Sequence, residues 1–237
     1  MNHQVNYSPV ALQVISELTP ISNKVPWQRS DDKQFVEVLN ADEIKSVCYY
    51  FKAPNSCFDF AGDKCSFHQY SDFYNLFNTL ENPVICQNDY QIEMSSGKAK
   101  INYRLANPEV VKAPFKNVAF SNPDASFKMS SDYLKRLRSL SGMNYINADR
   151  ISFAFDNNTV TTTLFATKDE NTFVDEIEAT TNEIKFSVTL DIKAFSKIPL
   201  ADYNVEVMSA GLMKFSMIRE DDIVVEIYIA EIDEDGE

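Results

Sequence analysis

The sequence is poor in the residues that most catalytic and cofactor-binding motifs require. Its 237 residues include only five glycines and two histidines. So few glycines cannot build the loops that hold nucleotide phosphates, and no such loop, nucleophile elbow or zinc-protease helix occurs. Two histidines also leave little capacity for acid–base catalysis near neutral pH. The sequence therefore predicts a protein that is not an enzyme and has no cofactor.

Long apolar runs are missing as well. No stretch has the length of apolar sequence that a membrane-spanning helix needs. Residues 1–7 lack both the charged and the apolar parts of a signal peptide. We therefore expect a soluble cytoplasmic protein with no membrane partner.

Cysteine is scarce, and its spacing does not predict a metal site. The four cysteines form no closely spaced pair and are typical of reduced core residues; they are Cys48, Cys57, Cys65 and Cys86. A zinc site built from them with His3 or His68 is the lesser alternative. The acidic runs at 220–222 and 231–237 lack the spaced ligands of a calcium loop, so we expect no metal ion.

The composition is that of an ordered, acidic protein. Apolar residues make up 44% of the chain and aromatic residues 12%, and the formal net charge is -13. A chain of this length and composition can bury a large core, in one large domain or two modest ones.

Four segments have the start signals and apolar spacing of short helices: 8–18, 71–80, 130–142 and 191–198. The first begins with Ser8 as N-cap and Pro9 at the first helical position. The segments recur regularly, because 63 residues separate Ser8 from Ser71 and 61 separate Ser130 from Asp191. Such spacing indicates a duplicated unit.

The sequence between these helices alternates as strands do. Alternation is clear at 182–190, and hairpin patterns join 150–155 to 159–165 and 91–94 to 100–105. Further strands are expected at 203–207, 212–215 and 223–229. The sequence therefore predicts an α+β fold of two tandem domains, each a mostly antiparallel sheet with two helices on one face.

A proline-containing segment separates the two halves. Pro108, Pro114 and Pro123 prevent a helix and disfavour a central strand between 107 and 126. We expect an N-terminal domain at 1–106, a connector at 107–126 and a C-terminal domain at 127–237. The connector is too apolar for a free linker, so either it packs on its own domains or it forms a docking surface.

The helix at 130–142 gathers positive charge in an acidic chain. Leu134 and Leu137 fall on one side of the helix; Lys135 points away from them, and Arg136 and Arg138 lie on either flank. An ordinary solvated face would give the same pattern. The alternative is that this face binds an anion.

Several runs resemble the DNA polymerase sliding clamps, most of all those of T-even-type bacteriophages within the superfamily of the proliferating cell nuclear antigen. These runs are FKMSSDYLKRLRSLS at 127–141, IKFSVTLDIKAF at 184–195, PLADYNV at 199–205 and DFYNLFNTL at 72–80. The resemblance implies two clamp-type domains per chain and a ring around duplex DNA that confers processivity on the replicative DNA polymerase.

The resemblance also implies functional residues and partners. Cations on the inner helices would contact the DNA backbone without reading bases, here Lys135, Arg136, Arg138, Lys193 and Lys197. A partner peptide would bind in a pocket between the connector and the C-terminal domain, at residues taken from Phe115, Val118, Phe120, Tyr228 and Ile232. The implied partners are the replicative polymerase, a clamp-loader ATPase and two further copies in a homotrimer, in the host-cell cytoplasm if a phage encodes the chain.

The first half departs from this pattern. Its first predicted helix carries only Glu17 as a charged residue, and the second carries Asp72 and Glu81. That part of the ring would be neutral or mildly acidic unless Lys24, Arg29, Lys98 or Lys100 reaches inward. Two alternatives stay open: a monomeric processivity subunit of the herpesvirus type, and a viral structural or scaffold protein that does not bind DNA.

Overall fold

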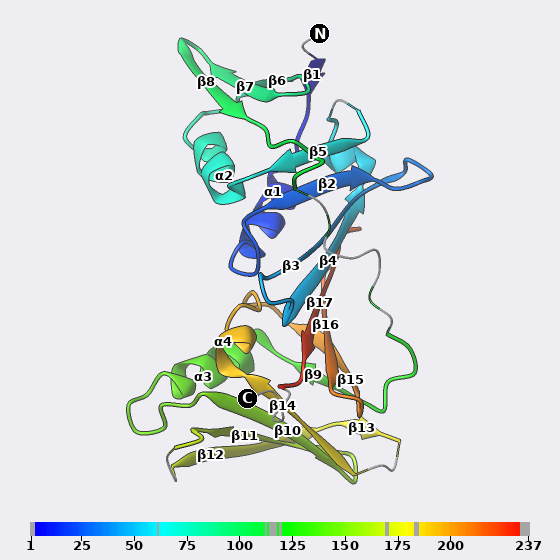
Figure 1. Ribbon diagram of the computed structural model, residues 1–237, viewed down its shortest axis with the longest axis vertical. Helices are drawn as coiled ribbons and strands as arrows, with labels where there is room; N and C mark the ends of the chain where they lie inside the picture. The colour runs from blue at the N-terminus through cyan, green and yellow to red at the C-terminus, as the bar shows by residue number, and fades with distance from the viewer. Residues whose placement is uncertain are drawn as a thin grey trace. The chain divides into compact units, whose positions relative to one another are not determined.

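The computed structural model describes residues 3–60, 62–111, 113, 118, 120–168, 171–182 and 185–232. These residues form two compact units (Figure 1). Unit 1 comprises Met1–Glu43, Tyr49–Asn117 and Arg219–Val225, and unit 2 comprises Ile44–Cys48, Val118–Ile218 and Glu226–Glu237. The main change from one unit to the other falls inside the proline-containing segment 107–126.

Unit 1 contains two helices and two antiparallel sheets. Its elements are β1 (His3–Val5), α1 (Pro9–Glu17), β2 (Val25–Arg29), β3 (Phe35–Ala41), β4 (Val47–Pro54), a short 3-10 turn (Asn55–Cys57), β5 (Lys64–Phe67), α2 (Tyr70–Asn78), β6 (Val84–Gln87), β7 (Gln91–Ser96) and β8 (Ala99–Arg104). One sheet has the strand order β1-β6-β7-β8, and in the other β4-β3-β2-β5 are neighbours.

Unit 2 repeats this composition. Its elements are β9 (Ala125–Met129), α3 (Ser131–Ser141), β10 (Arg150–Asp156), β11 (Thr159–Phe165), β12 (Thr172–Glu178), β13 (Thr180–Thr181), β14 (Phe186–Asp191), α4 (Ile192–Phe195), β15 (Tyr203–Met208), β16 (Leu212–Met217) and β17 (Val224–Ala230). The sheet orders are β12-β11-β10-β14 and β13-β9-β15-β16-β17.

The predicted α+β class with mostly antiparallel sheets is confirmed. The hairpin of β10 and β11 pairs Arg150 with Phe165, and that of β7 and β8 pairs Gln91 with Arg104. The strands of each unit are divided between two sheets, because alternating apolar residues on both sheets must be buried against the helices and each other.

The duplication is more regular in the structure than in the sequence. The four helix N-caps are Ser8, Gln69, Ser130 and Asp191, and each lies 61 residues after the one before. The predicted repeat of helices and strands is therefore confirmed.

The two helices whose boundaries differ from the prediction depend on distant residues or are very short. Helix α2 begins at Tyr70 because Asn23 accepts the backbone N–H of Ser71 at 2.8 Å and donates to Gln69 Oε1 at 2.7 Å. Helix α4 covers only Ile192–Phe195, so the segment expected to continue to residue 198 leaves the helix earlier. Local sequence alone could not set either limit.

Each unit has its own aromatic core. In unit 1 the Trp27 ring lies 4.4 Å from the Phe58 ring and 4.6 Å from the Phe67 ring, measured between centroids. In unit 2 Phe127 lies 5.9 Å from Phe153 in the same measure, and both side chains are buried. Because each unit buries a large apolar core, each supplies a rigid support for its helices.

Candidate nucleic-acid interface

Helix α3 is fixed at its start by two side chains. The Ser130 hydroxyl accepts the N–H of Tyr133 at 3.2 Å, and Asp202 accepts the N–H of Ser131 at 2.7 Å. These bonds satisfy amides that have no partner within a helix. Leu134 and Leu137 are fully buried beneath the helix, which packs on β11. The cations of α3 are thus held on a rigid support.

The two exposed cations of α3 have different surroundings. Lys135 is exposed at the middle of the helix. Arg136 is also exposed, but its Nη1 donates to Asp175 Oδ2 at 3.0 Å, and its guanidinium carbon lies 5.2 Å from the Phe173 ring centroid. Arg136 is therefore directed toward β12, and part of its charge is already compensated.

Arg138 is half-buried and poorly satisfied. Its Nε and Nη2 atoms are buried without a hydrogen-bond partner. Burial lowers the pKa of this guanidinium, and nearby Tyr203 acts in the opposite direction. Removing a charged donor from water without a partner is costly. A phosphate held near this guanidinium would offset part of that cost through its charge, without reaching the buried atoms.

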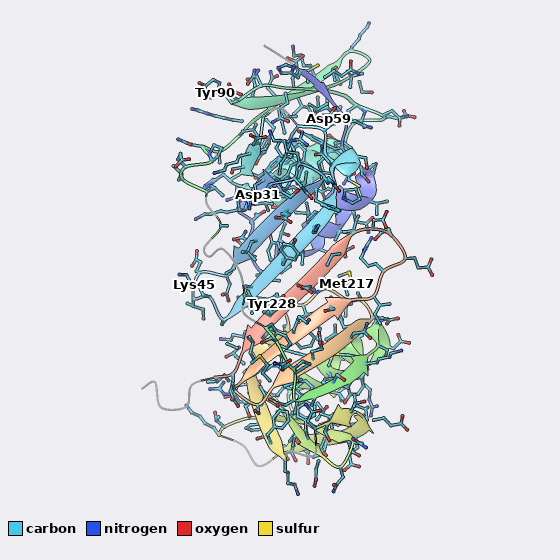
Figure 2. All side chains as sticks on the ribbon, turned by 90° about the vertical axis from the view of Figure 1, so that its right-hand side faces the viewer. Asp31, Lys45, Asp59, Tyr90, Met217 and Tyr228 are labelled. Atoms are coloured by element: carbon cyan, nitrogen blue, oxygen red, sulfur yellow. The ribbon has the colours of Figure 1, made fainter. Side chains whose placement is uncertain are left out.

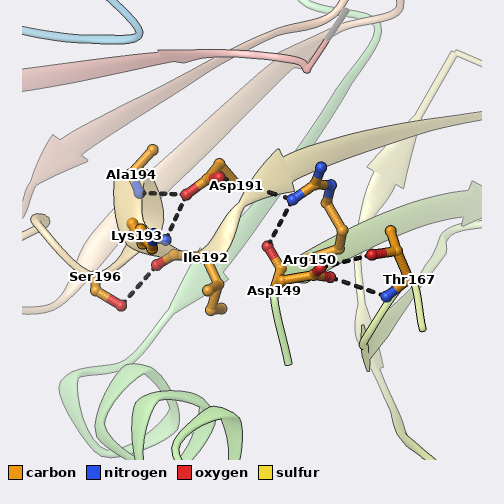
Figure 3. A network of polar contacts seen from close by, with 8 residues as sticks. All are labelled: Asp149, Arg150, Thr167, Asp191, Ile192, Lys193, Ala194 and Ser196. Carbon is orange, nitrogen blue, oxygen red and sulfur yellow. Dashed lines mark hydrogen bonds and ion pairs between the residues drawn. The ribbon is translucent and has the colours of Figure 1, made fainter. Parts of the chain in front are cut away.

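A polar network holds the start of α4 (Figure 3). Asp191 Oδ1 accepts the N–H of Lys193 at 2.6 Å and that of Ala194 at 3.2 Å. The Asp191 carboxylate also lies 3.7 Å from Arg150 Nη1, which donates to the Asp149 carbonyl at 3.1 Å. The network therefore fixes the direction in which Lys193 leaves the backbone.

The two lysines of this segment are placed differently. Lys193 is exposed on α4, whereas Lys197 is half-buried in the turn after the helix, where its N–H donates to the Ala194 carbonyl at 3.1 Å. Lys197 therefore does not lie on the fourth helix, which was expected to span 191–198, because α4 ends at Phe195. Figure 1 shows α3 and α4 on the same side of unit 2.

The helices of unit 1 have no comparable charge. Helix α1 has no acidic residue in its first turn and no basic residue in its last, and α2 has only Asp72. Two cations that could have added positive charge beside these helices have other partners. Arg29 donates to the Phe60 carbonyl at 2.8 Å, and Lys100 pairs with Glu93 at 2.8 Å. The positive charge on helices is thus concentrated in unit 2.

A second group of predicted residues lies on the sheet of unit 2. The Phe120 ring lies 6.1 Å from the Tyr228 ring, and Lys214 Nζ lies 4.8 Å from the Phe120 centroid. Lys214 also pairs with Glu206 of β15. Figure 2 labels Tyr228 on β17. Phe120 therefore packs against the strands and attaches the end of the connector to the sheet.

The Tyr228 side chain is buried and hydrogen-bonded. Its hydroxyl donates to Glu226 Oε2 at 2.6 Å, and burial together with that carboxylate raises the pKa of Tyr228. Ile232 lies at a different place, where its N–H donates to the Thr189 carbonyl at 3.0 Å. Val118 is half-buried, and Phe115 lies outside the described residues.

Comparison with known proteins gives similarity in structure only. No family model and no curated protein matches the sequence. The chain is similar to the proliferating cell nuclear antigen (PCNA) of Entamoeba histolytica, with a TM-score of 0.75 and 14% identity over 98% of this chain and 99% of that one. It is similar to the PCNA of Thermococcus kodakaraensis, with a TM-score of 0.73 and 12% identity over 98% and 100%.

A third similar structure is described as the C-terminal region of FEN-1 bound to A. fulgidus PCNA. The TM-score is 0.73, with 10% identity over 99% of both chains. The fold is the PCNA clamp fold. The similarity extends over nearly the whole chain, so it includes both units of the clamp fold.

Other kinds of site are not seen in the part of the chain that the structure describes. Within it, no group of three or more histidine, cysteine or acidic side chains could hold a metal ion. Within the same residues, every helix falls short of the length and apolar character that crossing a bilayer requires.

The sequence prediction missed the residues that position the cations. Asp175 lies 39 residues from Arg136, and Asp202 lies 71 residues from Ser131. Neither pairing has a local signal, because each depends on the register of strands. The nearest indication was that the chain has an acidic run at 175–178 as well as a basic helix at 131–141.

Proposed function

We propose that this chain is a subunit of a DNA sliding clamp, a homotrimeric ring that encircles duplex DNA and tethers a replicative polymerase. The proposal rests on one observation: an acidic chain of clamp fold carries its helix cations on α3 and α4. Such a protein has no catalytic role. We also propose a T-even-type bacteriophage source and action in the host-cell cytoplasm, from the resemblance of 127–141 and 184–195 to those clamps.

The DNA contact would be electrostatic and independent of sequence. Lys135, Arg138 and Lys193 would meet phosphates, with Arg136 and Lys197 contributing less because of their surroundings. The net charge of -13 would repel DNA from the remaining surface. A trimer would then present three basic sectors that alternate with three nearly neutral ones.

Two sheet edges support assembly from identical copies. Strand β8 ends one four-stranded sheet and β12 ends another. The first is basic, with Lys98, Lys100 and Arg104, and the second is acidic, with Asp175, Glu176 and Glu178. Pairing β8 of one copy with β12 of the next would cover both edges and match their charges. This head-to-tail contact closes into a ring where the rotation allows.

The surface around Phe120 would receive partner proteins. An archaeal PCNA of the same fold is described as bound to the C-terminal region of FEN-1. In this chain the polymerase and the clamp-loader ATPase would each insert a short apolar peptide beside Phe120, Val118 and Tyr228. Phe120 is half-buried rather than fully covered, so part of its ring remains available.

The DNA contact is tested by replacing Lys135, Arg136 and Arg138 together with alanine. We expect loss of loading and of long primer-extension products at physiological salt. The matched control replaces three exposed lysines elsewhere, Lys33, Lys168 and Lys185, and changes the net charge equally. Unchanged synthesis by the α3 variant, or equal loss in the control, would contradict the DNA assignment.

Assembly is tested by light scattering after gel filtration. We expect the mass of three chains, and a monomer when Glu176 and Glu178 are both replaced with lysine. Replacing Lys98 and Lys100 with glutamate in that same variant should restore the trimer. A wild-type monomer at micromolar concentration would exclude the ring and favour the monomeric processivity subunit of the herpesvirus type.

The partner surface is tested with Phe120→Ala. We expect weaker capture of the polymerase and shorter extension products, because the substitution removes a central aromatic contact. Gel filtration should still give the mass of the wild-type assembly. Full polymerase capture by this variant would show that partners dock elsewhere.

A further inference from the structure

Unit 1 contains a pocket that shares only Arg104 with the proposed subunit contact. Its volume is about 540 Å³, and it lies where the chain leaves β8 and crosses to β5. It is lined by residues of β5, of the end of β6 and the turn after it, and of the segment from Arg104 to Pro108. Its lining includes Lys64, Ser66, Asp89, Tyr90, Arg104 and Leu105.

The backbone around the pocket is fixed. The N–H of Ala106 donates to the Ser66 carbonyl at 2.9 Å, and the N–H of Leu105 donates to the Tyr90 carbonyl at 2.8 Å. Asn88 Oδ1 accepts the N–H of Tyr90 at 2.9 Å. The pocket is therefore preformed, and binding there would cost little ordering of the protein backbone.

Unit 2 has an equivalent corner, where the chain leaves β17 and meets β14, but there a side chain of the protein occupies it. There the N–H of Ile232 donates to the Thr189 carbonyl at 3.0 Å, as Ala106 does to Ser66 in unit 1. The N–H of Glu231 donates to the Gly211 carbonyl, as Leu105 does to Tyr90. The Glu231 carboxylate then accepts the N–H of Thr189 at 2.9 Å. A carboxylate thus occupies the corner of unit 2.

In unit 1 the equivalent place has no carboxylate where unit 2 has Glu231, and it has an excess of positive charge. Leu105 stands at the position of Glu231, and its side chain cannot accept a hydrogen bond. Lys64 and Arg104 bring two positive charges to the pocket, against one negative charge from Asp89. A local excess of positive charge is uncommon in a chain of net charge -13. The corner therefore suits a carboxylate supplied from outside.

Two further features favour an extended peptide over a small anion. Tyr90 is 77% exposed at the rim, where an aromatic ring provides a large contact area (Figure 2). Strand β5 is the outer strand of its sheet. At Ser66 the chain itself already binds it, through the bridge to Ala106 and a hydrogen bond from the Ser66 hydroxyl to the Val111 carbonyl at 3.3 Å, so an added segment would pair beside Lys64. An outer strand can pair with an added strand through its backbone.

We propose that this pocket binds an extended acidic segment of a partner protein. A carboxylate of the segment lies between Lys64 and Arg104, and a neighbouring apolar side chain packs on Tyr90. The pocket belongs to unit 1 alone, so the proposal does not rest on ring formation or on DNA binding.

The test selects random linear peptides displayed on phage against the full-length chain. Phage that bind a Lys64→Gln, Tyr90→Ala double variant are removed first. We expect the remaining peptides to be rich in aspartate and glutamate. A synthetic copy of an enriched peptide should lose about tenfold or more in affinity with either single substitution, measured by fluorescence anisotropy.

Two controls make the result decisive. Lys64 and Tyr90 are exposed, and circular dichroism melting curves should show that neither variant loses stability. Lys135→Ala on α3 should leave the affinity for the peptide unchanged. The proposal is overturned by a failure to enrich peptides, by enriched peptides without acidic residues, or by an affinity that follows Lys135 and not Lys64.

Discussion

Arg136 of α3 donates a hydrogen bond from Nη1 to Asp175 Oδ2 of β12 at 3.0 Å, across 39 residues of sequence. The pair is partly exposed, with 57% of the Arg136 side chain and 28% of the Asp175 side chain accessible. One of the three cations on this helix is therefore already partnered, which makes the three unequal in what they can offer to DNA.

The salt dependence of DNA binding should reveal this inequality. For Lys135→Ala we expect the slope of log affinity against log salt to fall in magnitude by about 0.9, the value for one duplex phosphate contact. For Arg136→Ala we expect a smaller change, because Asp175 already compensates its charge. Binding to labelled duplex DNA at several salt concentrations measures both slopes. Equal slopes for the two variants would contradict the prediction that Lys135 contributes more to DNA binding than Arg136.

Arg138→Met should separate stability from DNA binding. The substitution removes guanidinium atoms that are buried without a hydrogen-bond partner and keeps most of the apolar volume. We expect the melting temperature to stay the same or to rise, with a gain in folding free energy of up to about 1 kcal/mol. DNA affinity should fall. A clear loss of stability would show that Arg138 serves the fold.

Because of Asp202, part of the folding stability of unit 2 should be lost at low pH. The backbone N–H and then the hydroxyl of Ser131 hold the pKa of the Asp202 carboxyl below its usual range. A lowered pKa means stabilisation that is complete above the unfolded value of about 3.9 and is lost as pH falls through the folded value.

The corresponding measurement is urea unfolding between about pH 2 and pH 5. Stability of the wild type should rise with pH across this range, and the rise should be smaller in Asp202→Asn. The remaining rise comes from other carboxyls of lowered pKa, among them Asp124 and Asp149. Identical curves for the two proteins would refute a role for Asp202.

Gly211→Ala should cost more stability than Gly97→Ala. Both glycines have positive φ, +84° and +57°, so both substitutions strain the backbone by about 1 kcal/mol. An added Cβ at Gly97 meets nothing within 4 Å, whereas at Gly211 it would lie 2.9 Å from the Cβ of Glu231. We expect a further loss of about 1 kcal/mol or more at Gly211 from this clash. Chemical denaturation of both variants gives the comparison, and equal losses would show that Glu231 moves freely.

The sequence predicted elements whose signals are local. Helix α1 begins where Ser8 and Pro9 indicated, since the N-cap hydroxyl accepts the N–H of Ala11 three residues on, at 3.4 Å. The hairpin of β10 and β11 likewise turns at Asn157 and Asn158, whose positive φ values of 48° and 62° suit asparagine.

Features that depend on distant residues could not be predicted in this way. The start of α2 is set by Asn23, which lies 46 residues before Gln69. The pairing of Arg136 depends on the register of β12, and the pocket at Lys64 depends on where the chain leaves β8. Charge and periodicity therefore predicted which helix is basic, but not which of its cations is already partnered.

Trp27 is the only tryptophan of the chain, and it is buried in the aromatic core of unit 1. Its fluorescence therefore reports on that unit alone, while the far-ultraviolet circular dichroism reports on both. If the two signals change at different denaturant concentrations, the units unfold as separate cooperative bodies. The single buried indole thus allows the unfolding of unit 1 to be followed by tryptophan fluorescence without a contribution from unit 2.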